Sequence, residues 1–103
     1  MRFGWTSQFE ADLARLSEAE YKLFRKAAKE DFSPACDRHL THRGEAWPRK
    51  LRVKAMKNTD GVWDMTWSFS GPDGRATFEW VSVEGEIQIR WRRIGGHEIF
   101  KKP

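Results

Sequence analysis

The second half of the chain alternates apolar and polar residues with a period of two, and this pattern constrains the possible folds most strongly. Four runs show the alternation, at residues 51–56, 62–69, 75–80 and 87–91. Turn-forming sequences separate these runs, at Asn58–Gly61, Gly71–Gly74 and Glu84–Gly85. Because successive side chains of a strand point to opposite faces of a sheet, we expect four antiparallel strands connected as a meander.

The first half carries two helix-start signals. Ser7-x-x-Glu10 and Ser17-x-x-Glu20 are capping boxes, in which side chains satisfy amide donors that would otherwise lack partners. Two capped helices in tandem predict an antiparallel helical hairpin. We expect the second helix to end at residues 32–34, because the residue before a proline is biased out of the helical region. Ser33 as cap, with Pro34 at the first helical position, is the start signal of a short third helix.

An opening strand over residues 2–6 completes the predicted elements. We therefore expect one α+β domain over residues 1–103, with an N-terminal strand and a helical hairpin packed on a four-strand antiparallel sheet. A chain of 103 residues has the usual size of a domain with its own core. Residues 31–50 give the least clear pattern.

The composition favours a cytoplasmic protein. Cys36 is the single cysteine, which rules out an intramolecular disulfide and fits a reducing compartment. Charged residues are mixed into the first 20 positions, so no signal peptide is expected. No apolar run approaches the length that crosses a bilayer, and we expect no contact with a membrane.

The positive charge of the chain lies entirely in its second half. Residues 1–48 hold 8 Lys/Arg and 8 Asp/Glu, whereas residues 49–103 hold 11 Lys/Arg and 7 Asp/Glu, an excess of four. A basic sheet points to a polyanion or an acidic protein as partner. Net charge of this size is also common in proteins without such a partner.

Six tryptophans are unusual in so short a chain. Four of them share the parity of the apolar residues in their strands, which favours core packing: Trp63, Trp67, Trp80 and Trp91. Trp47 precedes a proline in a loop, and stacking on a nucleic-acid base stays open for it.

The segment Cys36-x-x-His39-x-x-His42 contains metal-ligating residue types. A zinc site needs four ligand positions and usually pairs two short clusters. No second cysteine exists, and on a helix these three positions drift around the cylinder. We expect no metal and no cofactor, and the role of the three residues stays open.

Arg93 and His97 stand out near the end of the chain. Arg93 continues the parity of Trp91, so we expect it at the end of the inner face, where a charge needs a partner or a ligand. His97 follows Gly95-Gly96, which allows a sharp bend. Histidine suits proton transfer near neutral pH, and an ordinary surface histidine in a mobile tail is the alternative.

Three further basic residues lie on or beside the polar parity of the strands. Lys54 and Lys57 belong to the first run and the turn after it, and Arg75 begins a strand directly after a turn. Simple exposure to solvent accounts for most lysines. Phosphate binding is the alternative that the basic sheet suggests.

The order of these elements resembles the RelE/ParE superfamily of toxins from bacterial toxin–antitoxin pairs. Leu51-Arg52-Val53-Lys54 followed by Gly61-Val62-Trp63 is similar to the basic strand, glycine and aromatic strand of that family. Asp73-Gly74-Arg75 resembles its strand-initial arginine. The tail Arg93-Ile94-Gly95-Gly96-His97-Glu98-Ile99-Phe100 looks most like the YafQ branch.

The resemblance implies a ribosome-dependent endoribonuclease that cuts mRNA by attack of a ribose 2′-OH on the adjacent phosphate. It implies that His97 is a general acid or base, and that Arg93 and Arg75 stabilise charge on the phosphate. Lys54 would hold a backbone phosphate or assist the base. The RNA-binding surface that we expect comprises Arg52, Lys57, Arg90, Arg92, Phe100 and Lys101.

The implied partners are a cognate antitoxin, mRNA and the ribosome, while the oligomeric state is not predicted. The tail tyrosine of RelE is absent, and Phe100 has no hydroxyl to replace it. ParE-like relatives inhibit gyrase and do not cut RNA. A non-catalytic inhibitor of that kind, or an RNA-binding module, is therefore the alternative function.

Overall fold

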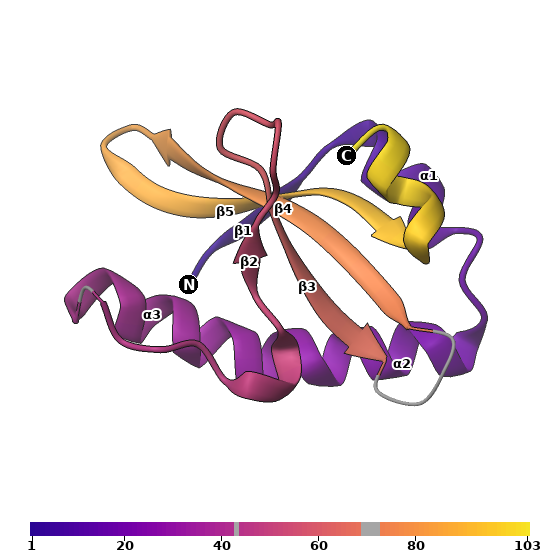
Figure 1. The fold of residues 1–103 in the computed structure, drawn as a ribbon, viewed down its shortest axis with the longest axis horizontal. Coiled ribbons are helices and arrows are strands. Elements are labelled where there is room, and N and C mark those ends of the chain that lie inside the picture. The colour runs from indigo at the N-terminus through magenta and orange to yellow at the C-terminus, as the bar shows by residue number, and fades with distance from the viewer. Residues whose placement is uncertain (43, 69–72) are drawn as a thin grey trace.

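The computed structural model describes residues 1–42, 44–68 and 73–103 and has an α+β fold (Figure 1). A five-stranded sheet has the strand order β1-β5-β4-β3-β2. The helices α2 (Glu18–Lys26) and α3 (Ser33–Thr41) run along one side of this sheet, and the C-terminal 3-10 helix η3 (His97–Lys101) lies on the other side (Figure 1). No helix in the described part of the chain is both long and apolar enough to cross a membrane.

The sheet is mixed, and the expectation of four antiparallel strands was wrong in this respect. The short strand β1 (Phe3–Trp5) joins the sheet beside β5 (Glu86–Gly95) and runs parallel to it, with Phe3 opposite Ile89. The alternation of apolar residues identified β1 as a strand. It carries no information on which strand β1 would pair with.

The meander is confirmed for β3 (Trp63–Ser68), β4 (Gly74–Val83) and β5, which pair antiparallel in sequence order. Glu84 and Gly85 join β4 to β5, both with positive φ, as a two-residue hairpin turn requires. Residues 69–72, which hold Phe69 and part of the expected turn at Gly71–Gly74, lie outside the described residues.

The strand expected over residues 51–56 is much shorter. Only β2 (Lys54–Ala55) pairs, with β3. Before it, Arg49–Leu51 form the 3-10 helix η2, and Arg52 adopts a left-handed backbone conformation with φ 46°. Leu51 is fully buried, so its apolar character reflects the anchoring of η2 in the core and not a position in a strand.

Two helices begin close to the predicted positions. The helix α1 (Ser7–Leu13) is capped by Thr6, one residue before the expected cap, and the Thr6 hydroxyl accepts a hydrogen bond from the Phe9 amide at 3.1 Å. The helix α2 (Glu18–Lys26) begins with the predicted capping box, in which the side chains of Ser17 and Glu20 each accept a backbone N–H of the other.

The short third helix expected from Ser33 and Pro34 is confirmed, but the second helix does not end before Pro34 as predicted. It continues through the π-helix η1 (Ala27–Phe32) into α3 (Ser33–Thr41), with Pro34 in the first turn of α3. A proline removes one hydrogen bond from a helix and its ring clashes with the carbonyl of the preceding turn. The wider turns of a π-helix change the hydrogen-bond register just before the proline, so the chain stays helical.

Aromatic side chains fill the core between the helices and the sheet. Phe32 from η1 contacts Phe78 of β4 and Trp91 of β5, with ring centroids 4.9 and 5.1 Å apart. The predicted core tryptophans are confirmed: Trp67 and Trp91 are buried, and Trp63 and Trp80 are half-buried against the cluster.

A β-bulge reverses the side-chain parity near the end of β5. Thr77 of β4 pairs with Arg93, and the next residue, Phe78, pairs with Trp91, so Arg92 is the extra residue. A bulge shifts the alternation by one position. Arg93 therefore faces the same side as Thr77, opposite the core, and the prediction that it continues the inner parity of Trp91 was wrong.

Candidate functional site

A buried carboxylate lies at the centre of the sheet face that is turned away from α2 and α3. Asp64 of β3 is 1% exposed, and its register partners are Lys54 on one side and Thr77 on the other. Thr77 in turn pairs with Arg93. Because directly paired residues share a face, this row presents Lys54, Asp64, Thr77 and Arg93 to one side of the sheet.

Arg75 is the closest cation to Asp64 and is itself buried. Its Nη1 lies 3.4 Å from Oδ1 of Asp64, and its Nη2 lies 3.5 Å from Oδ2 of Asp73. Burial raises the pKa of Asp64, and the charges of Lys54, Arg75 and His97 act in the opposite direction. Two of the four predicted catalytic residues, Lys54 and Arg75, therefore lie beside this carboxylate, and a third, His97, is close enough for its charge to affect it.

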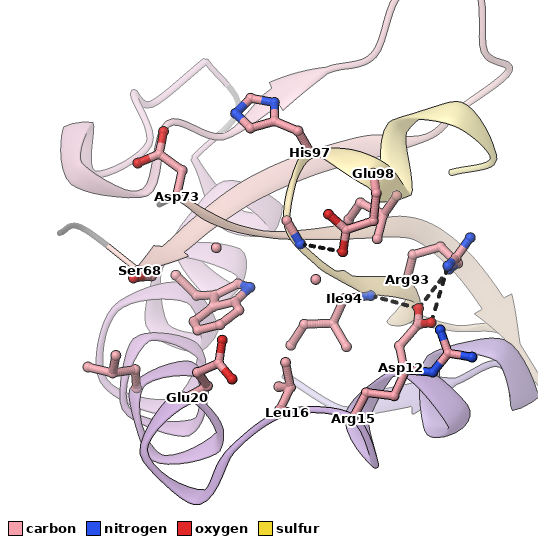
Figure 2. A pocket seen from close by; sticks show the side chains of 16 residues that line it. Asp12, Arg15, Leu16, Glu20, Ser68, Asp73, Arg93, Ile94, His97 and Glu98 are labelled. Atoms are coloured by element: carbon pink, nitrogen blue, oxygen red, sulfur yellow. Dashed lines mark hydrogen bonds and ion pairs between the residues drawn. The ribbon is translucent and has the colours of Figure 1, made fainter. Parts of the chain in front are cut away.

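His97 is the first residue of η3 and is exposed. Its ring meets Phe100 edge to face, with centroids 5.5 Å apart, and the guanidinium of Arg75 lies 6.0 Å from the Phe100 ring. The turn before it is held by the amide of Gly96, which donates to Oε1 of Glu98 at 2.9 Å. The imidazole points out over the cavity on the side of Asp73 (Figure 2).

Arg93 is engaged by a carboxylate that the sequence did not reveal as its partner. Its Nε and Nη2 donate to Asp12 of α1 at 2.6 and 3.1 Å, and its Nη1 donates to the carbonyl of Lys102 at 3.0 Å. The backbone amide of Ile94 also donates to Asp12, at 3.1 Å. Arg93 and His97 line one cavity of about 740 Å³, but the guanidinium is turned toward α1 (Figure 2).

The remaining predicted RNA-binding residues are spread over this face and its rim. Arg90 and Arg92 both contact Glu79, at 3.1 and 2.9 Å. Arg52 lies 3.5 Å from Asp73. Lys57 and Lys101 are exposed, and neither has an ion pair with another described residue.

Chemically, the group around Asp64 combines two cations with an exposed imidazole, which is able to accept and donate a proton near neutral pH. No model of a known protein family, no curated protein and no solved structure matches the chain. The chemistry of this group is therefore the basis for a functional assignment.

The segment with Cys36, His39 and His42 does not form a metal centre among the described residues. The Cys36 side chain is fully buried in the core. His39 stacks on Trp47, with ring centroids 4.6 Å apart, so Trp47 is half-buried against the protein and not a free stacking platform. His42 interacts with the hydroxyl of Thr41 at 2.9 Å.

Sequence reasoning missed Asp64 and Asp12. Asp64 could have been found, because a carboxylate in a strand of aromatic and apolar residues, beside a basic strand, is expected to be buried with a cation. Asp12 follows Phe9 at helical spacing and so lies near the buried face of α1. No local signal in the sequence connects it to Arg93, which is 81 residues away.

Proposed function

We propose that this chain is a RelE-type toxin, an endoribonuclease that cuts mRNA on the ribosome and is neutralised by an antitoxin. The observation that supports the proposal most is the grouping of Lys54, Arg75 and His97 around Asp64. Fixed cations stabilise the charge that builds up on a phosphate during attack. The order of elements, which resembles the RelE/ParE superfamily, is the second support.

In the proposed reaction the ribose 2′-OH attacks the adjacent phosphorus, and the bond from phosphorus to the 5′-oxygen breaks. The 2′-OH loses its proton and the 5′-oxygen gains one, so the products are a 2′,3′-cyclic phosphate and a 5′-hydroxyl. His97 is the residue proposed to move a proton at the phosphate. Lys54 is exposed and contacts a phosphate oxygen in this proposal. Arg75 is buried beside Asp64 and adds positive charge to the site.

For Arg93 we propose a positioning role. Its bidentate pair with Asp12 ties the end of β5 to α1, and His97 follows four residues later. The pair would thereby hold the backbone that carries the imidazole. Direct action of Arg93 on a phosphate, which the family resemblance implies, would require the guanidinium to leave Asp12.

The first test compares His97→Ala with a matched control, His42→Ala, which removes an exposed histidine elsewhere. General acid–base groups contribute about 10²–10⁴-fold to rate. We expect His97→Ala to lose growth inhibition and mRNA cleavage by at least about 100-fold, with unchanged circular dichroism, and His42→Ala to behave as the parent chain. Equal toxicity and cleavage in both variants would remove His97 from the mechanism.

A non-catalytic inhibitor on the same scaffold is the second candidate, and the engagement of both Arg75 and Arg93 by carboxylates favours it. Such a protein would act by binding through its basic face. Mapping mRNA ends after expression separates the candidates. Cuts in phase with codons support the toxin nuclease, whereas intact mRNA together with broken DNA supports an inhibitor of gyrase type.

A further inference from the structure

A second, smaller basic cavity lies at the end of β3, next to the site around Asp64. Its lining comes from η2, β3 and the start of β4 and comprises Arg49, Lys50, Arg52, Thr66 and Asp73. Its volume is about 480 Å³, which is ample for a phosphate with an attached ribose. We infer that this cavity binds a phosphate group of the RNA backbone, next to the phosphate that is cut.

Two buried polar atoms beside this cavity have no hydrogen-bond partner among the residues that the structure describes. They are Oγ1 of Thr66, in a residue that is 1% exposed, and Nε of Arg75, in a residue that is 7% exposed. Buried polar atoms in folded proteins nearly always have a partner, and an exception calls for a ligand or another cause. A hydroxyl and a guanidinium N–H can each donate a hydrogen bond to a phosphate oxygen.

The charges of the cavity favour an anion. Arg49 has no ion pair with any described residue, whereas Lys50 lies 3.1 Å from Asp31. The carboxylate of Asp73 also faces the cavity, but it is shared between Arg52 and Arg75, each at 3.5 Å. Its negative charge is therefore already matched, and the free charge on the lining is positive.

The basic residues of the cavity are carried on an anchored turn. Leu51 is fully buried and holds η2 against the core. Arg52 ends η2 in the left-handed conformation, with φ 46° and ψ 44°. A residue other than glycine in this region carries strain, and such strain concentrates at functional sites. Arg49 and Arg52 thus project from a fixed backbone, as a binding site for a small anion requires.

The spacing connects this cavity to the proposed reaction. Thr66 lies two residues beyond Asp64 on the same face of β3, which is roughly 6.6 Å along a strand. This is close to the separation of neighbouring phosphates in an RNA strand. Arg75 contacts Asp64 and Asp73 and so lies between the two positions. The assignment of RNA as the source of the phosphate rests on the proposed function, whereas anion binding does not.

The decisive variant is Thr66→Val, which removes the unpartnered hydroxyl and keeps the shape of the side chain. We expect the free protein to become more stable, with a thermal midpoint higher by roughly 2–6 °C, because an unsatisfied buried group is lost. We expect its affinity for inorganic phosphate to fall about tenfold. The control Thr59→Val removes a hydroxyl that donates to the Met56 carbonyl at 2.9 Å, and it should lower stability without changing phosphate binding.

Binding is measured by NMR on the full chain carrying His97→Ala, which keeps RNA intact, with inorganic phosphate and with a short single-stranded RNA. Phosphate should shift the side-chain Nε–H signal of Arg75. Arg49→Gln should reduce the dependence of log affinity for RNA on log salt by about 0.7, the value for one phosphate contact. Lys26 is exposed on α2, and Lys26→Gln is the control. It should change neither the phosphate-induced shift of the Arg75 signal nor the salt dependence of RNA affinity.

Four outcomes decide the inference. Two results would contradict phosphate binding in this cavity. One is an Arg75 Nε–H signal that does not shift when phosphate is added. The other is Thr66→Val and Arg49→Gln variants that bind phosphate and RNA as tightly as the parent chain. If RNA does not displace bound inorganic phosphate, the phosphate group that this cavity binds does not come from RNA. If the pocket behaves as described but the parent chain cuts no mRNA, the anion site stands and the nuclease proposal fails.

Discussion

At the scale of single residues, Asp12 connects segments that lie far apart in the sequence. Its carboxylate accepts two hydrogen bonds from Arg93 and one from the backbone of Ile94, which belongs to the edge of β5 beyond β1. An exposed edge amide would otherwise have only water as partner. One side chain of α1 therefore neutralises an arginine and covers a strand edge.

Replacing Asp12 by Asn should lower the free energy of unfolding by about 2–3 kcal/mol, because it leaves a partly buried arginine without its counter-charge. Urea unfolding at pH 7 measures this change. Glu10→Gln in the same helix removes an exposed carboxylate and should stay within about 0.5 kcal/mol of the parent. A loss as small as that of the control would mean that the Asp12–Arg93 pair adds little to stability.

The Asp12 carboxylate also makes the stability of the protein depend on pH. Burial acts to raise the pKa of Asp12, but the hydrogen bonds from Arg93, Ile94 and Gln8 outweigh it and hold the pKa below its usual value. A lowered pKa in the folded state means that the stabilisation is present above the unfolded pKa of about 3.9 and is lost as the pH falls through the folded pKa. The difference between the parent and Asp12→Asn in urea unfolding should therefore shrink below about pH 4. A difference that stays constant down to pH 2 would contradict this linkage.

At the scale of elements, the hairpin of β3 and β4 depends on a close approach between Trp67 and Gly74. A Cβ on Gly74 would lie 2.4 Å from Cε2 of the Trp67 ring, and the ring is fixed by a hydrogen bond from its Nε1 to the Arg75 carbonyl at 2.9 Å. Neither group can move without disturbing the core. Glycine is therefore required at this position by packing and not by a positive φ.

Gly74→Ala should destabilise the protein by about 1–3 kcal/mol, the usual cost of overpacking a core. Thermal unfolding followed by tryptophan fluorescence measures it. Gly4→Ala in β1 is the matched control, since no atom lies within 4 Å of its added Cβ. If Gly74→Ala unfolds at the same temperature as Gly4→Ala, the ring of Trp67 has room that the structure does not show.

Sequence patterns predicted the elements better than their ends and pairings. The capping box at Ser17 and the hairpin turn at Glu84–Gly85 depend on neighbouring residues, and both are confirmed. The helix that continues past Pro34 depends on a π-turn, and the shortened β2 depends on Leu51 reaching the core. These outcomes are decided by tertiary packing, which local patterns do not contain.

At the scale of the whole molecule, the cysteine reports global unfolding. Cys36 is fully buried in the main core cluster, and burial, with a smaller effect from Asp37, raises the pKa of its thiol to about 12. The thiolate is the reactive form. The native protein should therefore present almost no reactive sulfur at neutral pH.

We expect a thiol reagent such as iodoacetamide to modify Cys36 at pH 8 only through opening of the core, at least about 10³-fold more slowly than in 6 M urea. Mass spectrometry of timed samples gives both rates. In the Gly74→Ala variant the folded protein should be modified faster than the parent, in proportion to the loss of stability that this variant causes. Rapid modification of the folded parent chain would contradict the burial of Cys36.

The sequence predicted some residues of the candidate site but not how the fold assembles them. His97, Arg75 and Lys54 were identified by residue type, parity and resemblance, and the fold brings them around one carboxylate. The bulge at Arg92, which changes the side on which Arg93 lies, has no signature in the sequence. The site draws on β2, β3, β4 and η3, so its assembly depends on pairing that no local window contains.

We propose that His97 acts with Lys54 and Arg75 to cleave RNA by 2′-OH attack. The most direct test is single-turnover cleavage of an mRNA positioned in the ribosomal A site by the purified chain, with end-group analysis of the products. We expect a cut in phase with the codon, a 2′,3′-cyclic phosphate and a 5′-hydroxyl, and a loss of at least about 100-fold in His97→Ala. An uncut mRNA, or equal cleavage by the parent and His97→Ala, would contradict the proposal.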